Sequence, residues 1–138
     1  MIGIIVVTHS LLGESLIETA EFILGAPVEN VVSVSINVQK DVDELRIKVA
    51  DAIKNVDTGG GVVILTDMFG GTPSNLSYSF LEDGKVEVIS GVNLPVLIRA
   101  VGLQKEADLS KAAQNLVTSG KRSISLASGI LNGSRPGE

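Results

Sequence analysis

The sequence contains no cysteine and no tryptophan, and histidine occurs once among its 138 residues. Without cysteine the chain can form no disulfide, no thiolate zinc site and no thiolate nucleophile, which fits a reducing cytoplasm. The chain carries 16 acidic and 11 basic residues, so it lacks the basic surface that nucleic-acid binding requires. The single histidine excludes sites built from several imidazoles. Any histidine chemistry therefore depends on His9.

Long apolar runs are missing as well, although 44% of the residues are hydrophobic. The longest aliphatic run, residues 2–7, is far shorter than the roughly 20 residues of a membrane-spanning helix. No basic segment precedes this run and no cleavage pattern follows it, which argues against a signal peptide. We therefore expect a cytoplasmic protein with no direct membrane insertion. Its length predicts one domain, at residues 1–130, followed by a flexible tail at 131–138.

Short apolar runs alternate with helical patterns along the chain. Residues 2–7 and 62–65 are continuous aliphatic runs, typical of strands that are buried on both faces. Residues 32–38 alternate between apolar and polar side chains, which predicts a half-exposed strand. Further strands are predicted at residues 86–89 and 123–127, with helices at 12–23, 42–56 and 72–81, from 93 onward and at 109–117. Thr72 is the predicted N-cap of the third helix.

Strands that alternate with helices predict an α/β fold, here a three-layer sandwich with a mainly parallel sheet. The alternating strand belongs at the edge, and right-handed crossovers then give the strand order 2-1-3-4. In that order the winding direction changes between strands one and three, which opens a crevice at their carboxyl ends. His9 follows the first strand and Asp67 follows the third. The fold therefore predicts that these two side chains meet.

Histidine beside aspartate at such a crevice is suited to phosphoryl transfer. An aspartate that accepts the Nδ1–H of His9 fixes the tautomer and leaves Nε2 available as a nucleophile or base. Glycines allow backbone amides to approach an anion closely, and hydroxyl groups can donate to it. We therefore predict a catalytic pair and a set of phosphate-binding groups, with no metal ion and no cofactor. The pair is His9 and Asp67, and the phosphate-binding groups are Ser10, Gly70, Gly71 and Thr72.

Each of these residues also has an ordinary structural interpretation. A lone histidine at a strand end is often a satisfied structural group, and two glycines often form only a tight turn. Thr72 can act simply as a helix cap, and Asp67 can cap the turn that follows it. Only the combination of the residues favours a functional site.

Other site types lack their sequence motifs. No phosphate-binding P-loop, dinucleotide-binding glycine motif or hydrolase nucleophile elbow occurs. A response-regulator receiver domain also has an aspartate after its third strand, as this chain has Asp67. It requires further carboxylates after the first strand to hold magnesium, and residues 7–10 contain none. The receiver interpretation is therefore disfavoured.

Three segments resemble the IIA component of the mannose class of the bacterial phosphoenolpyruvate:sugar phosphotransferase system. They are residues 4–9, 66–75 and 91–97, and the resemblance covers residues 1–130. It implies a phosphotransferase with a phosphohistidine intermediate, in which the carrier HPr phosphorylates Nε2 of His9. The group would then pass to a IIB component, with Asp67 hydrogen-bonded to His9 and Thr72 near the phosphoryl group. The resemblance also implies a homodimer that exchanges a C-terminal strand, here residues 123–127.

The chain departs from the common pattern of that family in two respects. Many members have glycine where this chain has Ser10. In having a serine at this position, the chain resembles the phosphotransfer subunit of dihydroxyacetone kinases. The turn at residues 69–73 favours the mannose class. No linker or IIB domain follows residue 138, so we expect a free-standing IIA with a separate IIB protein as acceptor. Both a role in sugar uptake and phosphorylation and a role as a non-transferring regulatory binding module remain open, and the sequence does not identify a sugar.

Overall fold

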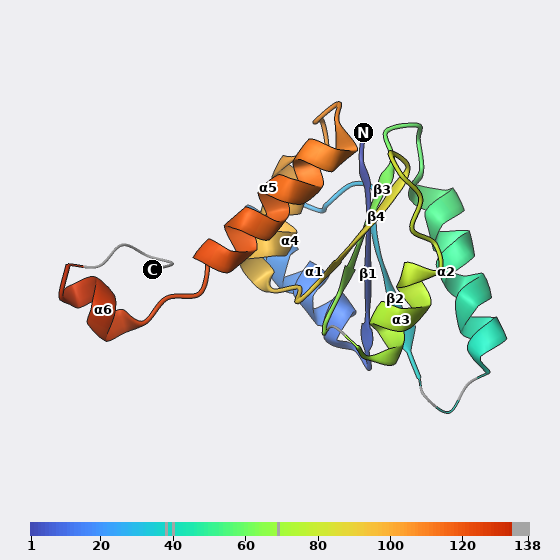
Figure 1. The fold of residues 1–138 in the computed structure, drawn as a ribbon, viewed down its shortest axis with the longest axis horizontal. Coiled ribbons are helices and arrows are strands. Elements are labelled where there is room, and N and C mark those ends of the chain that lie inside the picture. The colour runs from blue at the N-terminus through green and yellow to red at the C-terminus, as the bar shows by residue number, and fades with distance from the viewer. Residues whose placement is uncertain (38, 40, 69, 134–138) are drawn as a thin grey trace.

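The structure is a computed structural model that describes residues 1–37, 39, 41–68 and 70–133. A four-stranded sheet in the order β2-β1-β3-β4 forms its centre, and every pair of neighbouring strands is parallel. The predicted α/β class and strand order are confirmed (Figure 1). The strands are β1 (Gly3–His9), β2 (Val31–Ile36), β3 (Val62–Thr66) and β4 (Val86–Ser90). The helices are α1 (Leu12–Leu24), α2 (Val42–Val56), α3 (Thr72–Tyr78), α4 (Leu94–Gly102), α5 (Leu109–Arg122) and α6 (Ala127–Leu131).

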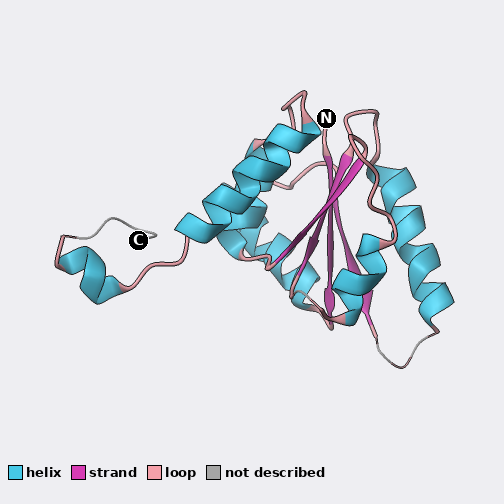
Figure 2. Cartoon of the chain, in the orientation of Figure 1, coloured by secondary structure: helices cyan, strands magenta, loops and turns pink. Residues whose placement is uncertain are grey.

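The sheet separates two apolar cores, one on each face. Ile4 and Val6 of β1 pack toward α1, α4 and α5, whereas Ile5 and Val7 pack toward α2 and α3. Figure 2 shows the helices on both sides of the strands. All four side chains are fully buried, and each contributes roughly 1.5–3 kcal/mol by leaving water. Burial on both faces explains why this strand is aliphatic at every position.

Several helix ends follow from local sequence signals. Gly25 ends α1 in the left-handed conformation, with a φ of 73°, and its N–H donates to the carbonyl of Glu21. Asp41 begins α2 by accepting a hydrogen bond from the N–H of Asp43. Asn93 begins α4 in the same way, through the N–H of Val96. These side chains satisfy amide groups that have no partner inside the helix.

The start of α3 differs from the prediction. Gly71, and not Thr72, is the N-cap, and Thr72 is the first helical residue. Gly71 has extended backbone angles, and its carbonyl accepts the hydrogen bond from the N–H of Asn75. The cap therefore needs no side chain at this position. The helix ends at Tyr78, earlier than residue 81, whereas α5 continues past residue 117 to Arg122.

The predicted strand at residues 123–127 is wrong for the single chain. No strand includes these residues, and Ala127 begins the short helix α6, which Figure 1 shows set apart from the sheet. A strand requires a neighbour that accepts and donates its backbone hydrogen bonds, and among the described residues none lies beside this segment. Ile124 and Leu126 are consequently exposed. Residues 134–138 of the predicted tail, and Val38 of the predicted second strand, lie outside the described residues.

Candidate functional site

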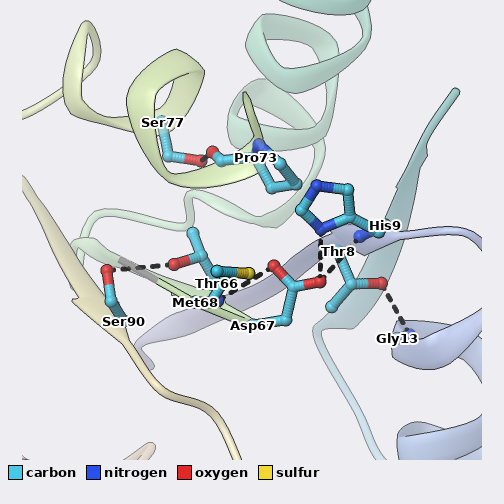
Figure 3. Close-up of polar contacts among 9 residues, drawn as sticks. All are labelled: Thr8, His9, Gly13, Thr66, Asp67, Met68, Pro73, Ser77 and Ser90. Carbon is cyan, nitrogen blue, oxygen red and sulfur yellow. Dashed lines mark hydrogen bonds and ion pairs between the residues drawn. The ribbon is translucent and has the colours of Figure 1, made fainter. Parts of the chain in front are cut away.

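His9 and Asp67 meet at the carboxyl end of the sheet. β1 ends at His9, and Asp67 directly follows β3, so the pairing of these neighbouring strands brings the two residues together. One carboxylate oxygen of Asp67, Oδ2, lies 2.8 Å from Nδ1 of the imidazole. The same oxygen accepts the backbone N–H of His9 at 2.9 Å, as Figure 3 shows. The two side chains therefore meet as predicted: one hydrogen bond joins Asp67 to the imidazole of His9 and the other joins it to the backbone of the same residue.

Asp67 remains ionised because neighbouring groups donate hydrogen bonds to its carboxylate. Burial alone raises the pKa of a carboxyl group, but the hydrogen bonds from the backbone and side chain of His9 oppose it. The charge interaction with His9 and the N–H of Met68, which donates to Oδ1 at 3.0 Å, act in the same direction. Together they hold the pKa of Asp67 below its ordinary value. The imidazole therefore faces a fixed negative charge through Nδ1.

The other ring nitrogen, Nε2, is available for chemistry. It has no hydrogen-bond partner among the described residues, and 40% of the His9 side chain is exposed, against 13% for Asp67. Donation of the Nδ1–H to Asp67 leaves the lone pair of the neutral imidazole on Nε2. The arrangement therefore presents a nucleophilic nitrogen outward from a ring of fixed orientation.

Gly71 forms one wall of the site. A Cβ atom at this position would lie only 2.9 Å from Cε1 of His9 and 3.6 Å from Nε2. A side chain here would displace the imidazole, so the backbone of Gly71 can lie against the ring only because it carries none. The turn from β3 to α3 thus approaches the reactive edge of His9.

The remaining predicted residues lie on the segments that directly follow His9 and Asp67. Ser10 follows His9 in the left-handed region, with a φ of 51°, which is uncommon for a residue with a side chain. Gly70 also has a positive φ, of 84°, and its carbonyl accepts the side-chain amide of Asn75 at 3.3 Å. Thr72 is half-buried at the start of α3. Within the described residues, none of these three forms a hydrogen bond with His9 or Asp67.

A hollow of about 560 Å³ opens beside the imidazole. It is bounded by the β1–α1 turn, the end of β2 and one side chain of α2. The sequence did not indicate that β2 and α2 line this hollow, because their hydrophobic patterns identify only the faces that pack into the core. Its lining residues are His9, Ser10, Leu11, Ser35, Ile36, Asn37 and Lys48. Leu11 and Met68 next to the site are exposed apolar side chains.

A cluster of hydroxyl groups behind Asp67 was also missed by the sequence analysis. The hydroxyl of Ser90 lies 3.1 Å from that of Thr66 and 3.0 Å from those of Ser74 and Tyr78. Thr66 directly precedes Asp67, and Ser74 belongs to the first turn of α3. The cluster therefore joins the strand end that carries Asp67 to the helix whose start faces His9. Isolated serine and threonine residues are too common for sequence alone to reveal such a cluster.

The described residues contain no group of three or more side chains suited to hold a metal ion. Within the same residues, no helix has the length and apolar character needed to cross a membrane.

Known proteins are similar to this chain in both sequence and fold. A family model described as "PTS system fructose IIA component" matches residues 3–117. The fructose-specific EIIA component of Bacillus subtilis is 30% identical over 129 residues, which cover 93% of this chain and 88% of that protein. The mannose-specific EIIAB component of Escherichia coli is 35% identical over 101 residues, or 72% of this chain and 31% of that protein.

A solved structure agrees with these sequence matches. The phosphotransferase system component EIIA from Streptococcus agalactiae superimposes with a TM-score of 0.82 at 27% identity, over 93% of this chain and 98% of that one.

Proposed function

This chain belongs to the fructose/mannose family of IIA components of the sugar phosphotransferase system, and we propose that His9 carries the phosphoryl group. We further propose that HPr is the donor, that a separate IIB protein is the acceptor and that transfer takes place in the cytoplasm. The single observation that supports His9 is the hydrogen bond of its Nδ1 to Asp67, because it leaves Nε2 exposed and nucleophilic.

The transfer follows from the state of the imidazole. The lone pair of Nε2 attacks the phosphorus of the donor's phosphohistidine, and a nitrogen–phosphorus bond forms on His9 as the donor's bond breaks. The donor imidazole leaves with the electron pair of the broken bond. The proton on Nδ1 of His9 stays in place, so the phosphorylated ring gains positive charge beside the ionised Asp67. Asp67 thereby orients the nucleophile and stabilises the intermediate.

The exposed face of His9 must also accommodate a phosphoryl group with several negative oxygens. We propose that the hydroxyls of Ser10 and Thr72 and the backbone amides of Gly70 and Gly71 contact these oxygens. Ser10 adjoins the imidazole in the hollow, and the backbone of Gly71 lies against the ring. Oriented backbone amides and hydroxyls bind anions without adding charge.

Phosphorylation of the purified full chain tests the proposal. Incubation with phosphoenolpyruvate, enzyme I and HPr is expected to add one phosphoryl group that is labile in acid and stable in base. His9→Ala is expected to accept none while keeping the thermal unfolding midpoint within a few degrees. Phosphorylation of His9→Ala to the wild-type extent would show that another residue is the acceptor.

Onward transfer separates a carrier from a regulatory module. The isolated phosphorylated chain is mixed with a candidate IIB protein, and the loss of label from His9 is followed over time. Movement of the label to the IIB protein supports the carrier function. Retention of the label on His9 in the presence of every IIB protein that the source organism encodes would favour the regulatory alternative.

We propose in addition that the chain forms a homodimer through residues 123–127. Ile124 and Leu126 in this segment are 73% and 72% exposed, and burying them against a second copy would remove apolar surface from water. A chain truncated after Arg122 is expected to sediment as a monomer while the full chain sediments as a dimer. Equal sedimentation of both forms would contradict the exchange.

A further inference from the structure

β2 forms one edge of the sheet, and its outer side has no strand beside it among the described residues. The N–H groups of Ile4 and Ser10 donate to the carbonyls of Asn30 and Ile36, so the even-numbered residues of this segment face β1. Backbone groups alternate in direction along a strand. The N–H and C=O groups of residues 31, 33 and 35 therefore point away from the sheet.

This edge lacks the protection that edge strands usually carry. Exposed edges are commonly blocked by charged side chains, proline or a bulge, because a free edge can pair with another chain. β2 reads Val-Val-Ser-Val-Ser-Ile, with neither charge nor proline. Its register with β1 is continuous over six residue pairs, so it has no bulge. The edge is therefore able to accept a further strand.

A trough runs along this edge between α1 and α2. One hollow of about 430 Å³ lies against residues 32–35 and the side chains of Asp51 and Asn55. A second, of about 360 Å³, lies against residues 31–33 and the side chains of Glu18 and Glu21. Glu14 lines both hollows. The trough thus follows β2 over most of its length.

The trough continues into the hollow beside His9. Ser35 and Lys48 line both the first hollow and the one that contains the imidazole. The hydroxyl oxygen of Ser35 is buried, and no hydrogen-bond partner for it occurs among the described residues. A buried hydroxyl without a partner is costly, so an unsatisfied polar group lies where the two hollows meet.

The charges that line the trough indicate the chemistry of its occupant. Glu14, Glu18, Glu21 and Asp51 line the two hollows, and Lys48 is the one cationic side chain among the described residues that line them. Glu21 also accepts the N–H of Val28, which leaves its negative charge in place. An occupant with basic side chains therefore complements this surface.

We propose that β2 binds an extended segment of another protein, rich in lysine or arginine, by addition of a strand to the sheet. Backbone hydrogen bonds to residues 31, 33 and 35 hold the segment, and the carboxylates of α1 and α2 select its basic side chains. One end of the bound segment lies beside His9, because the trough opens into that hollow. This binding site adjoins the hollow beside His9, but the open edge and the acidic side chains that support it do not depend on the function proposed for His9.

Nuclear magnetic resonance of the ¹⁵N-labelled full chain tests the strand addition. The probe is an acetylated and amidated peptide that alternates valine and lysine over eight residues. Hydrogen exchange is expected to slow at the amides of Val31, Ser33 and Ser35, and to stay unchanged at Val32 and Val34, which already face β1. The same peptide with alternate backbone nitrogens methylated is expected not to bind, because it cannot pair with the edge.

Charge reversal tests the choice of a basic occupant. The double variant Glu18→Lys with Asp51→Lys is expected to weaken binding of the lysine peptide by about tenfold. The matched control, Asp83→Lys with Glu106→Lys, makes the same change in net charge at residues outside the trough and is expected to bind within about twofold of wild type. Equal losses in both variants would show non-specific attraction and overturn the proposal.

Two other results would also overturn it. One is slowed exchange at β4, for example at Glu87, in place of β2. The other is tighter binding of a peptide with the sequence of residues 121–126, Lys-Arg-Ser-Ile-Ser-Leu, which would identify a second copy of this chain as the occupant. Neither result depends on whether His9 is phosphorylated, so failure here leaves the function proposed for His9 untouched.

Discussion

Oδ2 of Asp67 binds His9 twice, at 2.9 Å through the backbone N–H and at 2.8 Å through Nδ1 of the imidazole. The first bond fixes the carboxylate to the end of β1, and the second fixes the ring to the carboxylate. The orientation of the imidazole therefore depends on the pairing of β1 with β3. This dependence makes the consequences of individual substitutions predictable.

Asp67→Ala is expected to slow phosphoryl transfer to His9 by about 10- to 100-fold while the fold is retained, because the imidazole loses its orienting partner. Rapid-quench measurement with phosphorylated HPr checks the rate. Asp83→Ala, which removes an exposed carboxylate elsewhere, serves as the control and is expected to transfer at the wild-type rate. An unchanged rate for Asp67→Ala would remove its proposed role.

The same carboxylate predicts a dependence of stability on pH. The pKa of Asp67 is lower in the folded chain than its ordinary value of 3.8, so unfolding takes up a proton at acidic pH. Its contribution to the free energy of unfolding is fully present well above pH 3.8 and is lost as the pH falls through the folded pKa. Urea unfolding of wild type and Asp67→Ala between pH 7 and 3 is expected to show a difference that shrinks toward low pH. A difference that grows on acidification would contradict the assignment.

Gly71→Ala is expected to impair transfer more than folding. The added Cβ lies 2.9 Å from Cε1 of His9, and a displacement of the reacting ring by about 1 Å costs about 100-fold in rate. The stability loss is expected to be about 1–3 kcal/mol, as for other overpacked sites. Gly102→Ala is the control, since nothing lies within 4 Å of its Cβ position. Comparable rate losses in both variants would exclude a specific effect on the imidazole.

Two substitutions at Ser10 separate its hydroxyl from its backbone strain. Ser10→Gly relieves the positive φ of 51° and is expected to raise the free energy of unfolding by about 0.5–1 kcal/mol. Ser10→Ala keeps the strain and is expected to leave stability unchanged within about 0.5 kcal/mol. Both remove the hydroxyl, so both are expected to slow phosphoryl transfer by about 5- to 10-fold, the value of one hydrogen bond. Wild-type rates in both variants would show that the hydroxyl does not bind the phosphoryl group.

Ser90→Ala is expected to destabilise the chain by about 1–3 kcal/mol, because it leaves the buried hydroxyls of Thr66 and Ser74 without their common partner. Urea unfolding measures this loss. Ser125→Ala, at an exposed position, is the control and is expected to change stability by less than about 0.5 kcal/mol. Equal stability of the two variants would show that the hydroxyl cluster does not hold β3, β4 and α3 together.

The strand order was predictable because the hydrophobic pattern of each strand indicates whether one or both of its faces are buried. Continuous aliphatic runs identify β1 and β3 as central, and the alternation in β2 identifies an edge. The meeting of His9 and Asp67 follows from that order alone, because parallel strands present their carboxyl ends at one side of the sheet.

The incorrect predictions concern the start of α3 and residues 123–127, where the local sequence does not determine the backbone conformation. Thr72 and Gly71 are both acceptable helix caps, and only the observed backbone angles identify Gly71. Residues 123–127 have the alternation of a strand, but a strand also requires a neighbour, and the sequence of one chain does not state which edge is free. The hydroxyl cluster at Ser90 brings together β3, α3 and β4, and sequence spacing alone does not predict such contacts.

The sequence by itself therefore determined the fold class, the strand order and the pairing of the only histidine with Asp67, because periodicity and hydrophobicity act along the chain. Only the tertiary structure decided which ring nitrogen of His9 faces the carboxylate, how closely Gly71 approaches the ring and which strand edge stays open. These properties depend on how segments that are remote in sequence lie relative to one another. They are set by how the packed layers fit together, and that fit is a property of the whole core.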